Sequence, residues 1–413
     1  MREKFNNYVQ NMETYIMFRI KETVAKLTPE LTARGRTPIS LSMGAPTQAP
    51  PDEVIKTLQS ALCQNGIHTY STSKGEQFFR EACAKRIKNR FGVELNPDTE
   101  IYSLIGSKEG LANFIRILIN PTTEQNEEEI IMLPDPGYAS YKEMVKVSGG
   151  IPYSIPLTAE DDYMPDMEKV LENLIKDGYN PKKVKALLIN YPNNPLGATA
   201  TLDYFKSVVE FCKKHNILLI SDAAYTDMYF KPELKPASIF QVEGAKDIAV
   251  EFYSFSKPYA MTGWRIGWIC GNSEAVQMFG KLKSSLDSGI FKALQKAAAE
   301  ILNSDAGDKY IKEVNLMFKR NQTMFVEGLK ELGWKGFNIP DATFYLWLPI
   351  PPRYESAIKF ADDLLEKSGI VVVPGDGFGK YGKGFFRVSI VCPTEKIPEI
   401  FRRMKEDGFY FEG

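Results

Sequence analysis

The chain has 413 residues, of which 44% are hydrophobic and 25% charged, a composition typical of a folded protein with two or three domains. Lys and Arg number 51 against 52 Asp and Glu, so no basic excess favours nucleic acid or an anionic membrane surface as a partner. No apolar run approaches the thickness of a bilayer, and the first residues lack the apolar core of a signal peptide. We therefore expect a cytoplasmic protein that binds small molecules, with neither a nucleic-acid nor a membrane partner.

The cysteine content also indicates a cytoplasmic protein, and the cysteine and histidine content argues against a metal site. The 5 cysteines are scattered and form no C-x-x-C pair, which fits a reducing compartment, and there are only 2 histidines. We expect no metal site.

The predicted elements change in character along the chain. The first 55 or so residues hold one helical pattern and a short strand-like stretch, too little for a core of their own. Strand-length apolar runs then follow at 129–138, 184–195, 216–225 and 247–257, with helical patterns such as 204–216 between them. After about residue 300 come a long amphipathic pattern (310–333), strand-like runs (342–350, 370–375 and 385–391) and helical patterns (356–369 and 395–408).

The alternation in the middle of the chain predicts an α/β fold, with a mostly parallel sheet sandwiched by helices. The C-terminal part predicts a smaller α+β domain, and we expect the N-terminal residues to pack with it. The predicted boundaries are 1–55 for an N-terminal arm with part of the small domain, 56–300 for the large domain, and 301–413 for the small C-terminal domain.

Chemically varied side chains follow the predicted strands. Ligands of an open parallel sheet bind at the carboxyl ends of its strands. The residues expected there are Gly106, Ser107, Lys108, Tyr138, Asn193, Asn194, Asp222, Tyr225, Ser254, Ser256 and Lys257, with Arg265 soon after. Each alone is more typical of a cap or a turn, but Lys257 stands out because its segment otherwise consists of Tyr, Phe, Met and Trp. Their joint occurrence predicts a binding site at one edge of the sheet.

This combination of side chains suits pyridoxal 5'-phosphate. A lysine amine whose pKa is lowered by burial and by cationic neighbours forms a Schiff base with an aldehyde and also moves protons, and Lys257 is the candidate. A carboxylate such as Asp222 keeps the pyridine nitrogen protonated, which lets the ring accept electron density. Asn194 and Tyr225 suit the phenolic oxygen of the ring, and Tyr138 suits its face.

The phosphate of the same cofactor would need an anion cradle. Ser107 and Lys108 open a helix whose free backbone N–H groups favour a phosphate. Ser254 and the guanidinium of Arg265 complete the cradle.

Five segments resemble the class I/II aminotransferases of the fold type I pyridoxal-phosphate family. They are SFSKPYAMTGWRIGW (254–268), YPNNPLG, SDAAY, DPGYASY and FFRVSI, and the similarity runs from about residue 15 to the C-terminus. The resemblance implies that Lys257 is the Schiff-base lysine and Asp222 the partner of the pyridinium. It also implies that Asn194 and Tyr225 bind the phenolate oxygen of the cofactor ring, and that Arg265 and Ser254 bind its phosphate.

The resemblance also implies residues that the sheet argument does not reach. Arg387 in FFRVSI matches the arginine that binds the substrate α-carboxylate in a bidentate way, and Gly44 in LSMGAP matches the glycine whose backbone lies against the substrate. Tyr70 matches the tyrosine that reaches the phosphate of the neighbouring subunit, which implies a homodimer with shared active sites.

The implied activity is transfer of an α-amino group between an L-amino acid and a 2-oxo acid, with 2-oxoglutarate and glutamate as the expected pair. LIGSKEGLANF, DSGIFKALQKAA and DATFYLWLPIP are similar to the branch with LL-diaminopimelate, aspartate and alanine aminotransferases. SLDSG (285–289) stands where the plant-type enzyme has an asparagine before the glycine, and YSTSKGE and GAPTQAP also depart from the common patterns. The identity of the amino acid stays open.

Four alternatives compete with this interpretation. Ser254 to Lys257 spells the S-x-x-K of penicillin-recognising enzymes, but it ends a predicted strand and no KTG follows. Gly377, Gly379 and Gly382 form a G-x-G-x-x-G, but a strand follows where a nucleotide-binding fingerprint needs a helix. A non-catalytic regulatory protein would not need Lys257. Elimination on the same cofactor, as in a C–S lyase, uses the same ligands and stays the alternative reaction.

Overall fold

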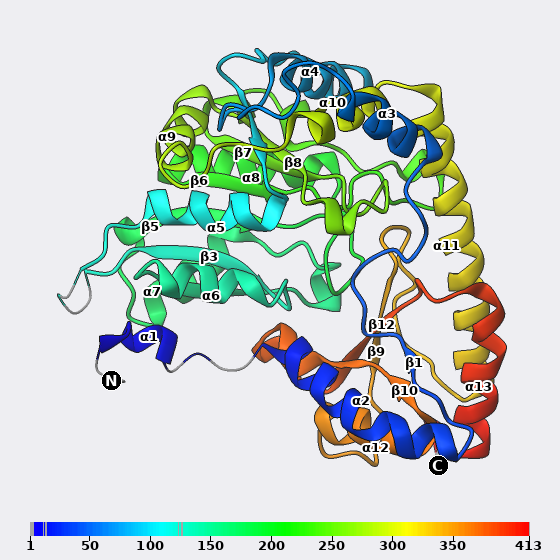
Figure 1. Ribbon diagram of the computed structural model, residues 1–413. Coiled ribbons are helices and arrows are strands. Elements are labelled where there is room, and N and C mark those ends of the chain that lie inside the picture. Colours follow the sequence, from blue (N-terminus) through cyan, green and yellow to red (C-terminus); the bar gives the residue numbers. More distant parts are fainter. Residues whose placement is uncertain (1–3, 11, 13–14, 123, 125–126, 413) are drawn as a thin grey trace.

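The computed structural model describes residues 4–10, 12, 15–122, 124 and 127–412. Its largest element is a seven-stranded sheet with the strand order β2-β8-β7-β6-β5-β3-β4 (Figure 1). The strands are β2 (Ile101–Leu104), β3 (Ile130–Asp135), β4 (Ile151–Pro156), β5 (Val184–Ile189), β6 (Leu218–Asp222), β7 (Ala249–Ser254) and β8 (Gly267–Gly271). Strand β8 runs antiparallel to β2 and β7, and the other neighbours pair in parallel. The predicted α/β class with a mostly parallel sheet is confirmed.

Helices cover both faces of this sheet because successive side chains of a buried strand point to opposite sides. In β6, Ile220 packs with the helices of one face, whereas Leu219 packs with those of the other. The first face carries α5 (Ser107–Leu118), α6 (Ser140–Val147) and α9 (Ser273–Lys283). The second carries α4 (Gln77–Phe91), α7 (Met167–Lys176), α8 (Leu202–His215) and α10 (Lys292–Leu302), with α3 (Asp52–Leu62) packed against α10.

Local sequence sets where these helices begin and end. The side chain of Thr201 caps α8 by accepting a hydrogen bond from the N–H of Tyr204 at 3.1 Å. The helix ends at Asn216, which adopts the left-handed conformation with φ 53°. Lys213, Lys214 and His215 lie in its last turn, where positive charge is favourable.

A second core forms around a three-stranded antiparallel sheet with the order β11-β12-β9. Its strands are β9 (Tyr345–Pro349), β11 (Val373–Pro374) and β12 (Phe385–Ser389). The helices of this part are α2 (Ile16–Ala33), α11 (Asp305–Glu331), α12 (Ala357–Ser368) and α13 (Ile397–Glu406), and a short helix, α1 (Asn7–Gln10), precedes them in the chain. Strand β1 (Ile39–Ser40) pairs in parallel with β10 (Ile370–Val371), so the N-terminal segment meets C-terminal residues. The exact domain boundaries stay a prediction.

The described residues contain neither a membrane-spanning helix nor a metal-binding cluster. None of the helices in this part of the chain is both long and apolar enough to cross a membrane. No group of three or more His, Cys, Asp or Glu side chains in the same part is arranged to hold a metal ion. All five cysteines are free thiols, and Cys63 is the exposed one.

Candidate active site

A cavity of about 450 Å3 lies where strands of the large sheet end and the second core begins. Many of the side chains predicted from the sequence line it together. They are Gly44, Ser107, Lys108, Tyr138, Asn194, Asp222, Tyr225, Ser254, Lys257, Arg265 and Arg387. The structure therefore brings residues separated by more than three hundred positions into one site.

Lys257 lies in the turn that follows β7 and is positioned by Gly44. Its ammonium Nζ donates a hydrogen bond to the carbonyl oxygen of Gly44 and lies 5.6 Å from the ring centre of Tyr225. Burial, the charge of Arg387 and the weaker effect of Arg265 together lower the pKa of the Lys257 amine to about 8, while Asp222 acts in the opposite direction. An amine with such a pKa is partly neutral near physiological pH and can act as a nucleophile or a base.

Asp222 is the last residue of β6 and its carboxylate faces the cavity. The hydroxyl of Tyr141 donates to Oδ2 at 2.5 Å, and the N–H of Ala224 donates to Oδ1 at 3.3 Å. Burial raises the pKa of this carboxyl, and these two hydrogen bonds oppose the rise. Such a carboxylate is best satisfied by a cationic donor on the cavity side, which is what a protonated ring nitrogen offers.

Arg387, from β12, reaches Asn194 across the cavity. One terminal nitrogen donates to Asn194 Oδ1 at 2.8 Å and the other to the carbonyl of Ser42 at 2.7 Å. The guanidinium lies 4.4 Å from the ring centre of Tyr345 and 4.8 Å from that of Phe378. Among the described residues, its buried Nε has no hydrogen-bond partner.

An anion cradle closes the opposite end of the cavity. Helix α5 begins at Ser107 without a side-chain cap, because the N-cap residue Gly106, with φ 78°, has no side chain. A Cβ on Gly106 would lie 2.3 Å from a terminal nitrogen of Arg265, so only glycine lets this guanidinium approach the start of the helix. Ser254 and Ser256 also line this end, and the backbone N–H of Ser256 donates to Ser254 Oγ at 3.1 Å. Free helix N–H groups beside a guanidinium form a binding site for phosphate.

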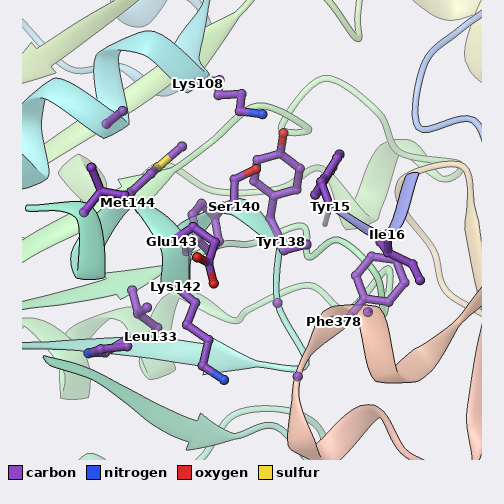
Figure 2. A pocket seen from close by; sticks show the side chains of 18 of the residues that line it. Tyr15, Ile16, Lys108, Leu133, Tyr138, Ser140, Lys142, Glu143, Met144 and Phe378 are labelled. Carbon is purple, nitrogen blue, oxygen red and sulfur yellow. The ribbon is translucent and has the colours of Figure 1, made fainter. Parts of the chain in front are cut away.

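Aromatic rings and the ammonium of Lys108 lie where this cavity meets a second one. The hydroxyls of Tyr225 and Tyr345 lie 2.9 Å apart. Lys108 Nζ lies 5.4 Å from the ring centre of Tyr15 and 5.8 Å from that of Tyr138. Beyond these rings a second cavity of about 1080 Å3 opens, and Figure 2 shows Tyr15, Tyr138 and Lys108 around it.

Tyr70 lies outside this cavity in the described chain. Its side chain is 86% exposed. The residues on either side of it contact α10 and the loop before α10. Lys292 Nζ donates to Thr69 Oγ1 at 2.7 Å, and the rings of His68 and Phe291 stack at 6.0 Å. The buried Gln295 bonds Ser71 Oγ at 3.0 Å and the N–H of Glu76 at 2.7 Å. Its predicted role needs a neighbouring subunit and stays a prediction.

Several residues that line the cavity are not among those predicted from the sequence: Tyr15, Met43, Tyr141, Asn190, Tyr345 and Phe378. Two of them carried a usable signal. Tyr141 follows Tyr138 by one helical turn, and Asn190 lies four residues before Asn194, whose N–H it accepts at 3.0 Å. Asn190 also donates to the carbonyl of Asp222 at 2.8 Å, so it holds two predicted site segments together.

Comparison with known proteins decides the family. The family model described as "Aminotransferase class I and II" matches residues 36–404. The chain belongs to the class I and II aminotransferases. An LL-diaminopimelate aminotransferase of Gloeobacter violaceus is 40% identical over 385 residues, which cover 93% of this chain and 94% of that protein. A protein with the same name from Aquifex aeolicus is 38% identical, with 94% and 99% covered.

Solved structures agree with this assignment. A substrate-bound BacF structure from Bacillus subtilis superposes with a TM-score of 0.89 and 32% identity, with 99% of each chain covered. An aspartate aminotransferase variant of Thermus thermophilus gives a TM-score of 0.87 and 25% identity, with 98% and 99% covered. The predicted family, the aminotransferase activity and the cofactor, pyridoxal phosphate, are confirmed.

The cavity of this aminotransferase fits the cofactor by its own chemistry. It offers a buried amine with a lowered pKa, a buried carboxylate open to a cationic donor, and an uncapped helix start beside a guanidinium. These groups match the aldehyde, the ring nitrogen and the phosphate. When bound, pyridoxal phosphate supplies an aldehyde for amino groups and a ring that accepts electron density from the substrate Cα.

The competing interpretations lose their structural basis. No helix starts at Ser254, which ends β7, so the S-x-x-K segment lacks the context of an acyl-transfer serine. Gly377 and Gly382 lie in two short 3-10 helices with Gly379 between them, and the segment leads to β12, not to a nucleotide-binding helix. The named relatives are aminotransferases, and this does not favour elimination.

Proposed function

We propose that this aminotransferase acts on an L-amino acid with a distal carboxylate, LL-diaminopimelate before aspartate, and uses 2-oxoglutarate as the acceptor. The observation that carries the proposal is the position of Lys108. Its ammonium lies at the junction of the two cavities, between Tyr15 and Tyr138, where the side chain of a bound amino acid would leave the inner cavity. A cation there favours a substrate whose far end is anionic.

The larger cavity adds room for a long substrate. Its volume of about 1080 Å3 exceeds what alanine or aspartate needs, and its wall carries both charged and apolar side chains, among them Lys142, Glu143 and Met144 (Figure 2). A donor with an amine and a carboxylate at its far end could satisfy both kinds of charge. The names of the relatives from Gloeobacter violaceus and Aquifex aeolicus support the same substrate.

The proposed roles follow from the contacts in the inner cavity. Arg387 binds the α-carboxylate through its fork, and its contacts with Asn194 and Ser42 fix the direction of that fork. Lys257 Nζ takes the proton from the Cα of the donor, because burial leaves its amine partly neutral. Gly44 holds Lys257 by its carbonyl oxygen and presents no side chain to the substrate.

The cofactor contacts are proposed on the same grounds. Asp222 holds a proton on the ring nitrogen, and Tyr141 fixes the orientation of its carboxylate. Tyr225 and Asn194 face the phenolic oxygen, and Tyr138 faces the ring. Ser107, Ser254, Arg265 and the backbone N–H of Lys108 hold the phosphate at the start of α5, which leaves the Lys108 ammonium for the substrate.

A homodimer in the cytoplasm completes the proposal. The exposed Phe291 stacks on His68, two residues before Tyr70, and Leu62, Phe78 and Leu286 are exposed apolar side chains on other segments. We propose that these side chains contribute to the surface that meets another subunit. We propose that Tyr70 there reaches the phosphate of the neighbouring subunit.

A panel of amino donors tests the substrate. Purified enzyme receives LL-diaminopimelate, aspartate, alanine or other L-amino acids with 2-oxoglutarate, while glutamate, pyruvate and ammonia are measured. We expect glutamate to form fastest with LL-diaminopimelate and only when the acceptor is present. Lys108→Met should lower kcat/KM for dicarboxylic donors by about tenfold but leave alanine less affected, since one charge-assisted contact is lost. Equal losses for alanine would contradict the distal role of Lys108, and pyruvate with ammonia in the absence of acceptor would indicate elimination.

Lys257→Ala tests the catalytic assignment. The variant should bind cofactor without the visible absorbance that covalent attachment gives, and its transamination should fall below detection. Lys206→Ala, at an exposed lysine outside the cavity, is the control. Retained activity in Lys257→Ala would remove Lys257 from the proposed role.

A further inference from the structure

Asp135 is a buried carboxylate that none of the roles above uses. It ends β3 and its side chain is only 4% exposed. Its carboxylate accepts three hydrogen bonds from two parts of the fold. Ser154 Oγ, in the neighbouring β4, donates to Oδ2 at 2.8 Å, while the backbone N–H groups of Lys380 and Tyr381 donate at 3.2 and 3.1 Å.

The two backbone donors belong to the turn between β11 and β12, which contains the G-x-G-x-x-G motif. Gly379 has φ +133°, and a Cβ there would lie 2.0 Å from Asp135 Oδ1. Gly382 packs against Gly375, where a Cβ would lie 2.1 Å from the carbonyl oxygen. The glycines therefore let residues 375–382, defined here as the glycine turn, fold around the carboxylate.

The glycine turn joins the two segments that carry proposed substrate and cofactor contacts. The N–H of Gly137, next to Tyr138, donates to the carbonyl of Phe378 at 2.9 Å. The Phe378 ring lies 4.8 Å from the Arg387 guanidinium, and Figure 2 shows it beside Ile16 and below Tyr138. The turn also leads directly into β12, which carries Arg387.

We propose that Asp135 is a positioning residue for the transamination: by holding the glycine turn on the end of β3, it keeps Phe378 and Arg387 in place for the substrate carboxylate. Hydrogen bonds to an ionised acceptor are stronger than neutral ones, so the two N–H groups both fix the turn and stabilise the buried charge. The inference rests on the proposed role of Arg387.

The substitution Asp135→Asn tests the contact with little change in shape. Asparagine replaces one acceptor oxygen by an NH2 group, which cannot accept from a backbone N–H, so at least one bond to the glycine turn is lost. Ser154→Ala is the matched control, because it removes the third hydrogen bond of the same carboxylate and leaves both bonds to the turn. Both variants are prepared as cofactor-loaded enzyme.

Two measurements follow, and one of them does not depend on activity. Amide hydrogen exchange reads the protection of residues 376–389, and a titration with glutarate, a dicarboxylate that cannot be aminated, reads carboxylate binding through the cofactor absorbance. In Asp135→Asn we expect faster exchange in the glycine turn, glutarate affinity weaker by about tenfold and a similar rise in KM for 2-oxoglutarate, with kcat changed less. Ser154→Ala should stay within about twofold of the wild type.

Faster exchange with unchanged glutarate affinity would overturn the inference, as would an equal loss of affinity in Ser154→Ala. If Asp135→Asn does not fold, Gly379→Ala carries the same prediction, because its Cβ would push the turn away from an intact Asp135. Wild-type enzyme that fails to bind glutarate or to transaminate would instead contradict the proposed function.

Discussion

The lowered pKa of Lys257 allows a quantitative test of the site. Burial is its largest cause and the charge of Arg387 the second, and together with weaker contributions they lower the pKa from 10.5 to about 8. At about pH 7.5 this leaves about a quarter of the amine neutral, compared with about one part in a thousand for an ordinary lysine. The difference corresponds to about 3 kcal/mol, at about 1.4 kcal/mol per pKa unit.

Arg387→Met should raise the pKa of Lys257. Both cations lie against Gly44: its carbonyl oxygen accepts from Lys257, and a Cβ on it would lie 3.8 Å from both terminal nitrogens of Arg387. Two unit charges about 7 Å apart at an effective dielectric constant of about 20 repel each other by about 2 kcal/mol. Removing the charge of Arg387 should therefore raise the pKa by about one unit or somewhat more.

The assay labels Lys257 in cofactor-free protein. A small aldehyde is added across a pH series, the product is fixed with borohydride, and the labelled peptide is quantified by mass spectrometry. The midpoint of the labelling rate reports the pKa, and we expect it to move to higher pH in Arg387→Met.

Arg387→Lys separates charge from geometry. It keeps the positive charge, so the labelling midpoint should stay close to that of the wild type, although the bidentate fork for the substrate is lost and kcat/KM should fall about tenfold or more. An unchanged midpoint in Arg387→Met would refute the electrostatic reasoning. An equal shift in both variants would show that repacking, not charge, sets the pKa.

Two further predictions concern stability. Lys283 is fully buried, and its Nζ lies 2.7 Å from Asp287 and 3.1 Å from Glu109, so Lys283→Met should lower the free energy of unfolding by about 3–5 kcal/mol in urea titrations. Lys206→Met, at an exposed pair with Asp203, should cost less than about 1 kcal/mol. Similar losses in the two variants would contradict the reasoning. Hydrogen bonds from Arg402 and Arg403 lower the pKa of Glu399 to about 2, so its stabilisation is present above the ordinary value of 4.5 and is lost as the pH falls toward 2. Glu399→Gln should therefore lower the free energy of unfolding by less than about 1 kcal/mol at neutral pH, because solvent screens the ion pairs, and should not change it in strong acid. A loss of stability that grows as the pH falls would contradict this pH dependence.

The site residues that the strand pattern could predict lie at or soon after the ends of buried strands of the large sheet. Asp222 ends β6 and Lys257 follows β7, and parallel strands deliver such residues to one edge whatever the distance along the chain. The fold could be predicted for the same reason, since strand-length apolar runs alternating with amphipathic helices allow few arrangements.

The residues that the sequence could not place reach the cavity by tertiary packing. Tyr345 lies in an antiparallel strand of the second core and meets Tyr225 only because the two cores pack together. Tyr15 comes from the N-terminal segment, where no local pattern indicates which cavity the ring will enter. The glycine motif folds into a turn, but nothing in its spacing names Asp135 as the carboxylate that the turn surrounds.

The segment that carries Tyr70 has a consequence for assembly. Because Lys292, Phe291 and Gln295 already hold residues 68–76 in place within one chain, this surface is ordered before any second subunit arrives. In the proposed dimer, association would then cost little conformational entropy at this surface and would proceed as the docking of two preformed faces. The speed of pairing would depend on collision and orientation, and dilution would separate the subunits without unfolding this segment.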